Sequence, residues 1–274
     1  MSNKGTKIDP YQSIFNVFLY SMKITFLGTG TSQGIPMIAN TEPVSLSENP
    51  KDKRLRCSAM IEWEGARYII DCGPDFRQQM LREKVDWISG VLFTHEHADH
   101  TAGIDDLRPF TYKMGEVPIY ANERVIENLK VRFAYIFATE NRYAGAPKLQ
   151  ENIVPNDSFE LHGVEVTPIE VMHGKLPIYA YRFGDVAYIT DLKSISEEEK
   201  RKLQNLDVLI VNALRIQEHP THLNLEEALK FVQEIRPKRA YFTHISHRLG
   251  FHHEIEKELP ENVFLSYDGM QIEL

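Results

Sequence analysis

The stretch Val91-Leu92-Phe93-Thr94-His95-Glu96-His97-Ala98-Asp99-His100 is the most informative part of this sequence. It begins with a short apolar run that predicts a buried strand, and it ends with three histidines and one aspartate in six positions. His95 and His97 are two residues apart, so a continuing strand would place both on one face. Asp99 and His100 follow where the chain is expected to turn into a helix. Imidazoles and carboxylates bind metal ions, and this density predicts ligands for two adjacent ions rather than a solvated turn.

This run resembles the H-x-H-x-D-H signature of the metallo-β-lactamase superfamily. The resemblance implies further ligands downstream in a fixed order, each after a strand: a histidine, an acidic bridging residue and a last histidine. It also implies an aspartate after an earlier hairpin, and it extends over residues 22–274. The matching segments are Tyr68-Ile69-Ile70-Asp71-Cys72-Gly73, Glu170-Val171-Met172-His173-Gly174, Tyr188-Ile189-Thr190-Asp191 and Tyr241-Phe242-Thr243-His244.

The resemblance implies an α/β fold, a four-layer αβ/βα sandwich made by residues 22–274 as a single domain. Residues 1–21 are expected to form an N-terminal extension. The implied site holds two divalent ions ~3.5–4 Å apart that share a hydroxide, with zinc or manganese as the metal and iron as a further possibility. The implied ligands are His95, His97 and His173 for the first ion, Asp99, His100 and His244 for the second, and Asp191 as the bridge, with Asp71 fixing a ligand ring.

Within the superfamily, the chain most resembles the phosphoribosyl 1,2-cyclic phosphodiesterases. The resemblance rests on the start Leu27-Gly28-Thr29-Gly30-Thr31-Ser32, on the 17 residues between His173 and Asp191, and on His222 in His219-Pro220-Thr221-His222. It implies that Asp99 orients the nucleophile and that His222 stabilises or protonates the leaving oxygen. The alternative for His222 is a surface loop histidine. The loop 28–34 would either cradle a phosphate or simply turn the chain.

Several other polar residues remain open to two interpretations. Arg108 could hold a substrate phosphate, or pair with Asp105 or Asp106 at the surface. His247 is expected to line the pocket, whereas His252 and His253 are expected at the surface.

Two loops are also open to interpretation. Relatives often carry a structural zinc in the loop 36–56, but the candidate positions here are Asn40, Glu42 and Ser45, so we expect none. The segment Tyr135–Leu149 is a candidate lid or dimer contact, with a core segment as the alternative.

Composition restricts the remaining possibilities. The 274 residues carry a formal net charge of −8, which argues against broad nucleic-acid binding through a basic surface. Two cysteines, Cys57 and Cys72, cannot form a disulfide framework, so a reducing cytoplasm is expected. No apolar run approaches the ~20 residues that span a membrane, and Ile14–Tyr20 is too short for a signal peptide.

The sequence therefore predicts a dinuclear metal-dependent hydrolase of a small anionic phosphodiester, with a homodimer as a family-level expectation. The alternatives are tRNA 3′ processing, thioester or lactam hydrolysis, and a non-catalytic metal-binding protein. The short interval between His173 and Asp191 leaves no room for the tRNA-gripping arm of the processing enzymes, which makes a nucleic-acid substrate the weaker expectation.

Overall fold

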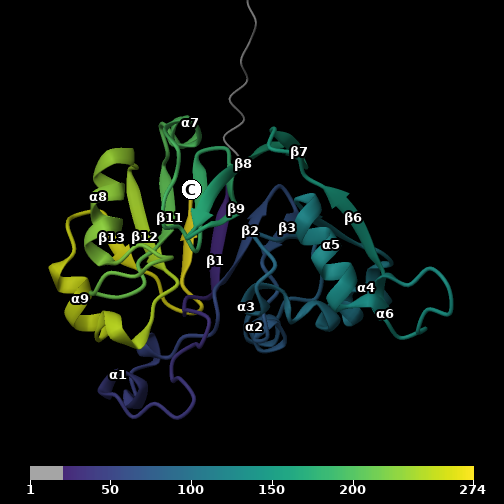
Figure 1. Cartoon of the computed structure of the whole chain (residues 1–274), viewed down its shortest axis with the longest axis horizontal. Coiled ribbons are helices and arrows are strands. Elements are labelled where there is room, and N and C mark those ends of the chain that lie inside the picture. Colours follow the sequence, from purple (N-terminus) through teal and green to yellow (C-terminus); the bar gives the residue numbers. More distant parts are fainter. Residues whose placement is uncertain (1–20) are drawn as a thin grey trace, which may run out of the picture.

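Two seven-stranded sheets face each other across the middle of the molecule (Figure 1). The computed structural model describes residues 21–274, and the predicted N-terminal extension lies outside the described residues except for Ser21. In spatial order, the first sheet consists of β14 (Gln271–Glu273), β1 (Lys23–Gly28), β2 (Ser58–Trp63), β3 (Ala66–Ile70), β4 (Gly90–Leu92), β5 (Val117–Ala121) and β6 (Leu149–Ile153). The second consists of β13 (Val263–Leu265), β12 (Arg239–Thr243), β11 (Val208–Asn212), β10 (Val186–Ile189), β9 (Leu176–Phe183), β8 (Val164–His173) and β7 (Phe159–Leu161).

Helices cover the outer face of each sheet, which gives the predicted four layers. One apolar cluster joins the first sheet to α2, α4 and α5, and another joins the second sheet to α8 and α9. The central strands are thus buried on both faces, which explains why β4, β10 and β11 are apolar runs rather than alternating ones. The helices are α1 (Pro43–Leu46), α2 (Phe76–Glu83), α3 (Ala98–Thr101), α4 (Arg108–Met114), α5 (Glu123–Arg132), α6 (Ala134–Phe137), α7 (Glu197–Lys200), α8 (Leu225–Ile235) and α9 (His252–Glu258).

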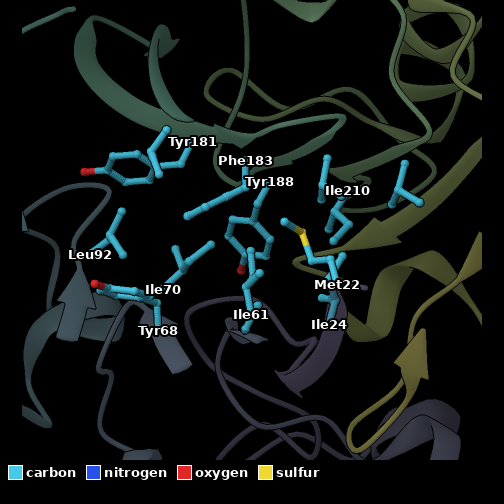
Figure 2. Packing of buried hydrophobic residues seen from close by; sticks show 14 of the residues in the cluster. Met22, Ile24, Ile61, Tyr68, Ile70, Leu92, Tyr181, Phe183, Tyr188 and Ile210 are labelled. Atoms are coloured by element: carbon cyan, nitrogen blue, oxygen red, sulfur yellow. The ribbon is translucent and has the colours of Figure 1, made fainter. Parts of the chain in front are cut away.

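A third apolar cluster fills the space between the two sheets. Figure 2 shows side chains such as Ile61 and Tyr68 from the first sheet packed against Phe183, Tyr188 and Ile210 from the second. A hydrogen bond joins the same two layers: the Oη of Tyr181 in β9 donates to the carbonyl of Phe93, just after β4, at 2.8 Å. This inner core fixes the separation of the sheets and therefore of the loops at their common edge.

Local sequence signals explain most element boundaries. The hairpin of β2 and β3 turns at Glu64 and Gly65, whose φ values of 45° and 75° are those of a type I′ turn. The side chain of Asn122 caps α5 by accepting from the amide of Val125. Asn224 and Glu227 form the expected capping box of α8.

Three helical segments are irregular at a boundary. The segment Ala98–Leu107 is divided into α3 and a 3₁₀ turn, Ile104–Leu107, with Gly103 between them. The helix after Asn122 breaks at Phe133, whose φ of −120° is not helical. Asp75 occupies the N-cap position of α2 but does not cap it, because its carboxylate accepts from Arg56 instead.

The strand directions bring several chain reversals to one edge. β3 runs parallel to β4, and β10, β11 and β12 run parallel to one another. The carboxyl ends of parallel strands lie at the same edge of a sheet, so the segments after these strands gather there. No helix in residues 21–274 has the length and apolar character needed to cross a bilayer.

The inner core yields a stability prediction. Ile210 is fully buried between the sheets, so Ile210→Ala should lower the free energy of unfolding by about 2–5 kcal/mol, measured by urea denaturation. Ile38 is 86% exposed, so Ile38→Ala should change it by less than about 0.5 kcal/mol. Equal losses in the two variants would contradict the assigned core.

Candidate metal centre

The histidines of the central motif gather at the carboxyl end of β4. The strand ends at Leu92, and the following residues bring the Nε2 atom of His95 to 3.0 Å from Nδ1 of His97. His173, the last residue of β8, lies beside them, with ring centroids 5.7 Å from His95 and 5.2 Å from His97. One ligand atom from each of these three histidines lies within 4.8 Å of the others. The two sheets thus contribute to one histidine group.

A second group adjoins the first. The Nε2 atom of His100 lies 3.2 Å from the carboxylate of Asp99, and Nε2 of His244 lies 3.9 Å from the same carboxylate. Asp191 stands between the groups: its Oδ2 is 3.3 Å from His100, its Oδ1 is 3.3 Å from His244, and it also groups with His95. The structure therefore brings together all seven residues predicted as ligands, and places Asp191 where the two groups meet.

Three site residues have the same unusual backbone conformation. Asp71, Asp191 and His244 each follow a strand and adopt positive φ values of 62°, 56° and 54°. Non-glycine residues rarely occupy this left-handed region, and such strain concentrates at functional sites. All three of these polar side chains are buried. These residues end the apolar segments Tyr68–Ile70, Tyr188–Thr190 and Tyr241–Thr243, which explains the similarity of those segments in the sequence.

Asp71 holds the ring of His100. Its carboxylate accepts from the amide and the hydroxyl of Thr94, both at 2.8 Å, and from Nδ1 of His100 at 2.7 Å. The hydrogen on Nδ1 of His100 leaves Nε2 facing the centre as a lone-pair donor in the neutral ring. This contact is the one that the sequence analysis expects of Asp71.

The electrostatics of the site favour a bound cation. Burial, followed by the neighbouring His100, holds the pKa of His95 well below its usual value, so its ring is neutral. Burial acts to raise the pKa of Asp191, but His244 and His100 outweigh it and hold the pKa well below the usual range. Around His100, the carboxylates of Asp99 and Asp71 likewise outweigh burial and raise the pKa of the ring well above its usual value. The carboxylates thus draw positive charge to this position.

Buried ring nitrogens in the two ligand groups indicate whether metal ions fit these residues. Nε2 of His100 and both ring nitrogens of His244 are buried and have no hydrogen-bond partner among residues 21–274. Buried polar atoms are normally satisfied, so these ring nitrogens point to an absent partner. Imidazole nitrogens with carboxylate oxygens are a donor set that suits zinc, manganese and iron. The residues present therefore fit two divalent cations.

His222 enters the site from the loop between β11 and α8. It is buried, and its Nε2 lies 2.9 Å from Oδ1 of Asp191, so it is not a surface histidine. Burial lowers the pKa of His222 to about 4, and Asp191 only partly opposes this shift. The same loop brings in Thr221 and His219, which sequence reasoning did not single out, although both lie in the segment 219–222 that marked His222.

Other predicted candidates take structural positions. Arg108 donates to Asp105 at 2.6 Å, which is the ion-pair alternative. His247 is buried beside the loop 36–56, with Nε2 3.4 Å from Glu42 and 3.5 Å from Asn40.

The expectation that His252 lies at the surface is wrong. It is 1% exposed, because it opens α9 against the guanidinium of Arg54 at 3.1 Å and its amide donates to Asp52. His253, the next residue, is exposed as expected.

The glycine-rich loop 28–34 turns the chain. The amides of Thr29, Gly30, Thr31 and Gly34 all donate to acceptors within the protein. An added Cβ at Gly28 would lie 1.9 Å from the carbonyl oxygen of Arg56, so this glycine permits close backbone approach. The loop is therefore explained by packing.

The segment Tyr135–Leu149, proposed as a lid, a dimer contact or a core segment, is mostly a surface loop. Ile136 and Ala146 are buried in it, whereas Tyr135 and Tyr143 are exposed.

Comparison with known proteins identifies the family. Residues 66–245 match the family model of the β-lactamase superfamily domain. A solved diphosphatase of the PhnP family is 40% identical, with a TM-score of 0.87 over 93% of this chain and 97% of that one. Zn²⁺-bound PqqB from Methylobacterium extorquens, at 18% identity and a TM-score of 0.74, covers 92% of this chain and 100% of its own and shares the fold.

Curated relatives match over part of their length. An octanoyltransferase of Porphyromonas gingivalis is 38% identical over 91% of this chain and 51% of that protein. A ribonuclease Z of Methanosarcina acetivorans is 29% identical over 56% of this chain and 41% of that protein. The chain thus spans about half the length of the curated relatives it matches.

The chain belongs to the β-lactamase superfamily and has its metallo-β-lactamase fold. The family and the fold indicate a hydrolase. Within this class, the PhnP-family diphosphatase is consistent with the phosphodiesterase branch that the sequence resembles.

The contact between Asp71 and His100 yields the prediction for this site. Asp71→Asn leaves an amide that no longer balances the ring charge, so affinity for Zn²⁺ should fall about 10- to 100-fold. Isothermal titration of the metal-free protein measures this. Asp52→Asn is the matched control, since Asp52 is equally buried but binds Ser47 and the His252 amide. Equal affinity in wild type and Asp71→Asn would contradict the assigned role.

Proposed function

We propose that this protein is a dinuclear metal-dependent phosphodiesterase that hydrolyses a small, cyclic phosphodiester. The observation that carries the proposal is the position of Asp191, where two ligand groups and the ring of His222 meet. In this proposal His95, His97 and His173 hold one ion, Asp99, His100 and His244 hold the other, and Asp191 contacts both. Bound divalent ions would lower the pKa of a water molecule toward neutrality and polarise a phosphoryl oxygen.

The protein's own side chains supply orientation and a hydrogen-bond donor. Asp99 is 15% exposed at its side chain, so its carboxylate is open to an attacking water and can accept a hydrogen bond from it. His222 presents Nε2 to Oδ1 of Asp191, whereas His100 faces Oδ2, and in this proposal Nε2 donates to the oxygen that leaves phosphorus. General acid assistance of this kind contributes about 10²–10⁴ in rate.

The relatives support phosphorus chemistry more than the alternatives. The solved relative at 40% identity is a diphosphatase of the PhnP family, and this name indicates a reaction at phosphorus. The ribonuclease Z relatives favour an RNA substrate, but their identity is 29% or less and the net charge of −8 disfavours a long polyanion. Thioester or lactam hydrolysis would not need the proton donor His222.

The proposal also covers the cellular compartment, the metal and the oligomeric state. Cys57 and Cys72 are free and buried, which suits a reducing cytoplasm. The metal is proposed to be zinc or manganese on the basis of the mixed imidazole and carboxylate groups. A homodimer follows from the family resemblance.

Phosphorus NMR tests the substrate directly. Zinc- or manganese-loaded protein should remove the strained-ring signal of a ribose 1,2-cyclic phosphate, and a chelator should abolish this activity. An unchanged spectrum with both metals bound would overturn the cyclic substrate and direct the search to acyclic diesters and RNA ends.

His222→Ala tests the proton donor. Phosphodiester hydrolysis should fall about 10²–10⁴-fold, whereas any thioester hydrolysis should be spared, as measured by steady-state kinetics. His253→Ala, which removes an exposed histidine, is the control and should retain wild-type rates. Equal phosphodiesterase activity in wild type and His222→Ala would show that His222 takes no part in the chemistry.

A further inference from the structure

One residue, Thr221, contacts two histidines of the site through two different groups. Its carbonyl oxygen lies 3.0 Å from Nδ1 of His173, and its hydroxyl oxygen lies 3.0 Å from Nδ1 of His222. We propose that Thr221 is a positioning residue that fixes the ring tautomers of both histidines, and thereby directs the Nε2–H of His222 as a hydrogen-bond donor toward the leaving oxygen. The part that concerns the reaction rests on the proposed function.

In the hydrogen bond between Thr221 and His173, only His173 can be the donor. A backbone carbonyl accepts hydrogen bonds and cannot donate, so Nδ1 of His173 must carry the hydrogen. In the neutral ring, Nε2 then has the free lone pair. His173 is thereby prepared to act as a ligand in the group with His95 and His97.

The contacts of His222 fix the opposite arrangement. The carboxylate of Asp191 only accepts, so Nε2 of His222 carries a hydrogen toward the site. In the neutral ring the lone pair is then on Nδ1, which needs a donor. Two groups lie close enough, the hydroxyl of Thr221 at 3.0 Å and Nδ1 of His219 at 3.1 Å.

The backbone of the loop selects between these two donors. The amide of Thr221 donates to Nδ1 of His219 at 3.3 Å, which makes that nitrogen an acceptor. The hydroxyl of Thr221 has a single hydrogen and two ring nitrogens within reach, Nδ1 of His222 at 3.0 Å and Nδ1 of His219 at 3.2 Å. Because the amide of Thr221 already donates to His219, the hydroxyl is assigned as the donor to His222. This hydrogen bond keeps the N–H of His222 on Nε2, on the side of Asp191, where it would donate a hydrogen bond to the leaving oxygen.

Packing holds the Thr221 side chain in place. Gly174 has a φ of 63°, and a Cβ built on it would lie 2.8 Å from Cγ2 of Thr221. The methyl group of Thr221 thus lies against a backbone that has no side chain of its own. A β-branched residue has few rotamers, so seating the methyl group also directs the hydroxyl. Threonine serves this position better than serine for that reason.

Ring nitrogen NMR of zinc-loaded, ¹⁵N-histidine-labelled protein tests the tautomers without reference to activity. In wild type, His222 should carry its hydrogen on Nε2 and His173 on Nδ1. Thr221→Val removes the hydroxyl but keeps the shape and the carbonyl, so the His222 tautomer should shift while His173 stays unchanged. Thr221→Ser should restore the wild-type signals of His222.

Two results would overturn the positioning role. One is an unchanged His222 tautomer in Thr221→Val. The other is a tautomer that changes in His219→Ala but not in Thr221→Val, which would make His219 the donor. Thermal melting of each variant confirms that the ring signals are compared in folded protein.

Kinetics then connect the tautomer to the chemistry. With an alkyl leaving group, Thr221→Val should lower kcat about 10-fold or more with KM within about twofold. With a nitrophenyl leaving group, which needs little protonation, the loss should stay under about threefold. Thr221→Ser should recover most of the alkyl rate. If wild type cleaves no phosphodiester while the tautomer still shifts in Thr221→Val, the proposed function fails and the positioning role stands.

Discussion

The carboxylate of Asp191 is the contact on which the arrangement of the site depends. It lies within 3.3 Å of His100, His244 and His222, which come from three separate segments and from both halves of the chain. Such a buried carboxylate is costly unless positive charge or hydrogen-bond donors surround it. In the proposed function two divalent cations would satisfy this requirement, and they would also contact ring nitrogens of His100 and His244 that have no partner among residues 21–274. The charges that destabilise the metal-free site would then be the ones that bind the metals.

The fold makes this meeting of segments possible. An apolar core between the sheets, with Tyr188 and Phe183 among its large side chains, holds the two halves at a fixed separation (Figure 2). Left-handed backbone turns after the strands then direct Asp71, Asp191 and His244 back toward the sheet edge. The packing of the sheets offsets the free-energy cost of the strained turns and of the buried charges. Stability and site geometry thus depend on the same inner core.

The sequence was sufficient for the family, the four layers and the grouping of the predicted ligands, because a dense motif and its downstream partners have few alternative interpretations. It was insufficient where long-range packing decides. His252 looked like a surface histidine because Arg54, its partner, is 198 residues away in the chain. Arg108 forms an ion pair with the neighbouring carboxylate of Asp105. The contacts of Thr221 depend on the conformation of one loop, and threonine has no pattern that marks such a role before the loop is seen.

Anomalous X-ray diffraction from crystals of the zinc-loaded protein tests the central claim most directly. The account predicts two zinc peaks in each chain about 3.5–4 Å apart, one beside His95, His97 and His173 and the other beside His100 and His244, with the Asp191 carboxylate between them. A single peak, or two peaks that leave Asp191 without a zinc neighbour, would contradict the account.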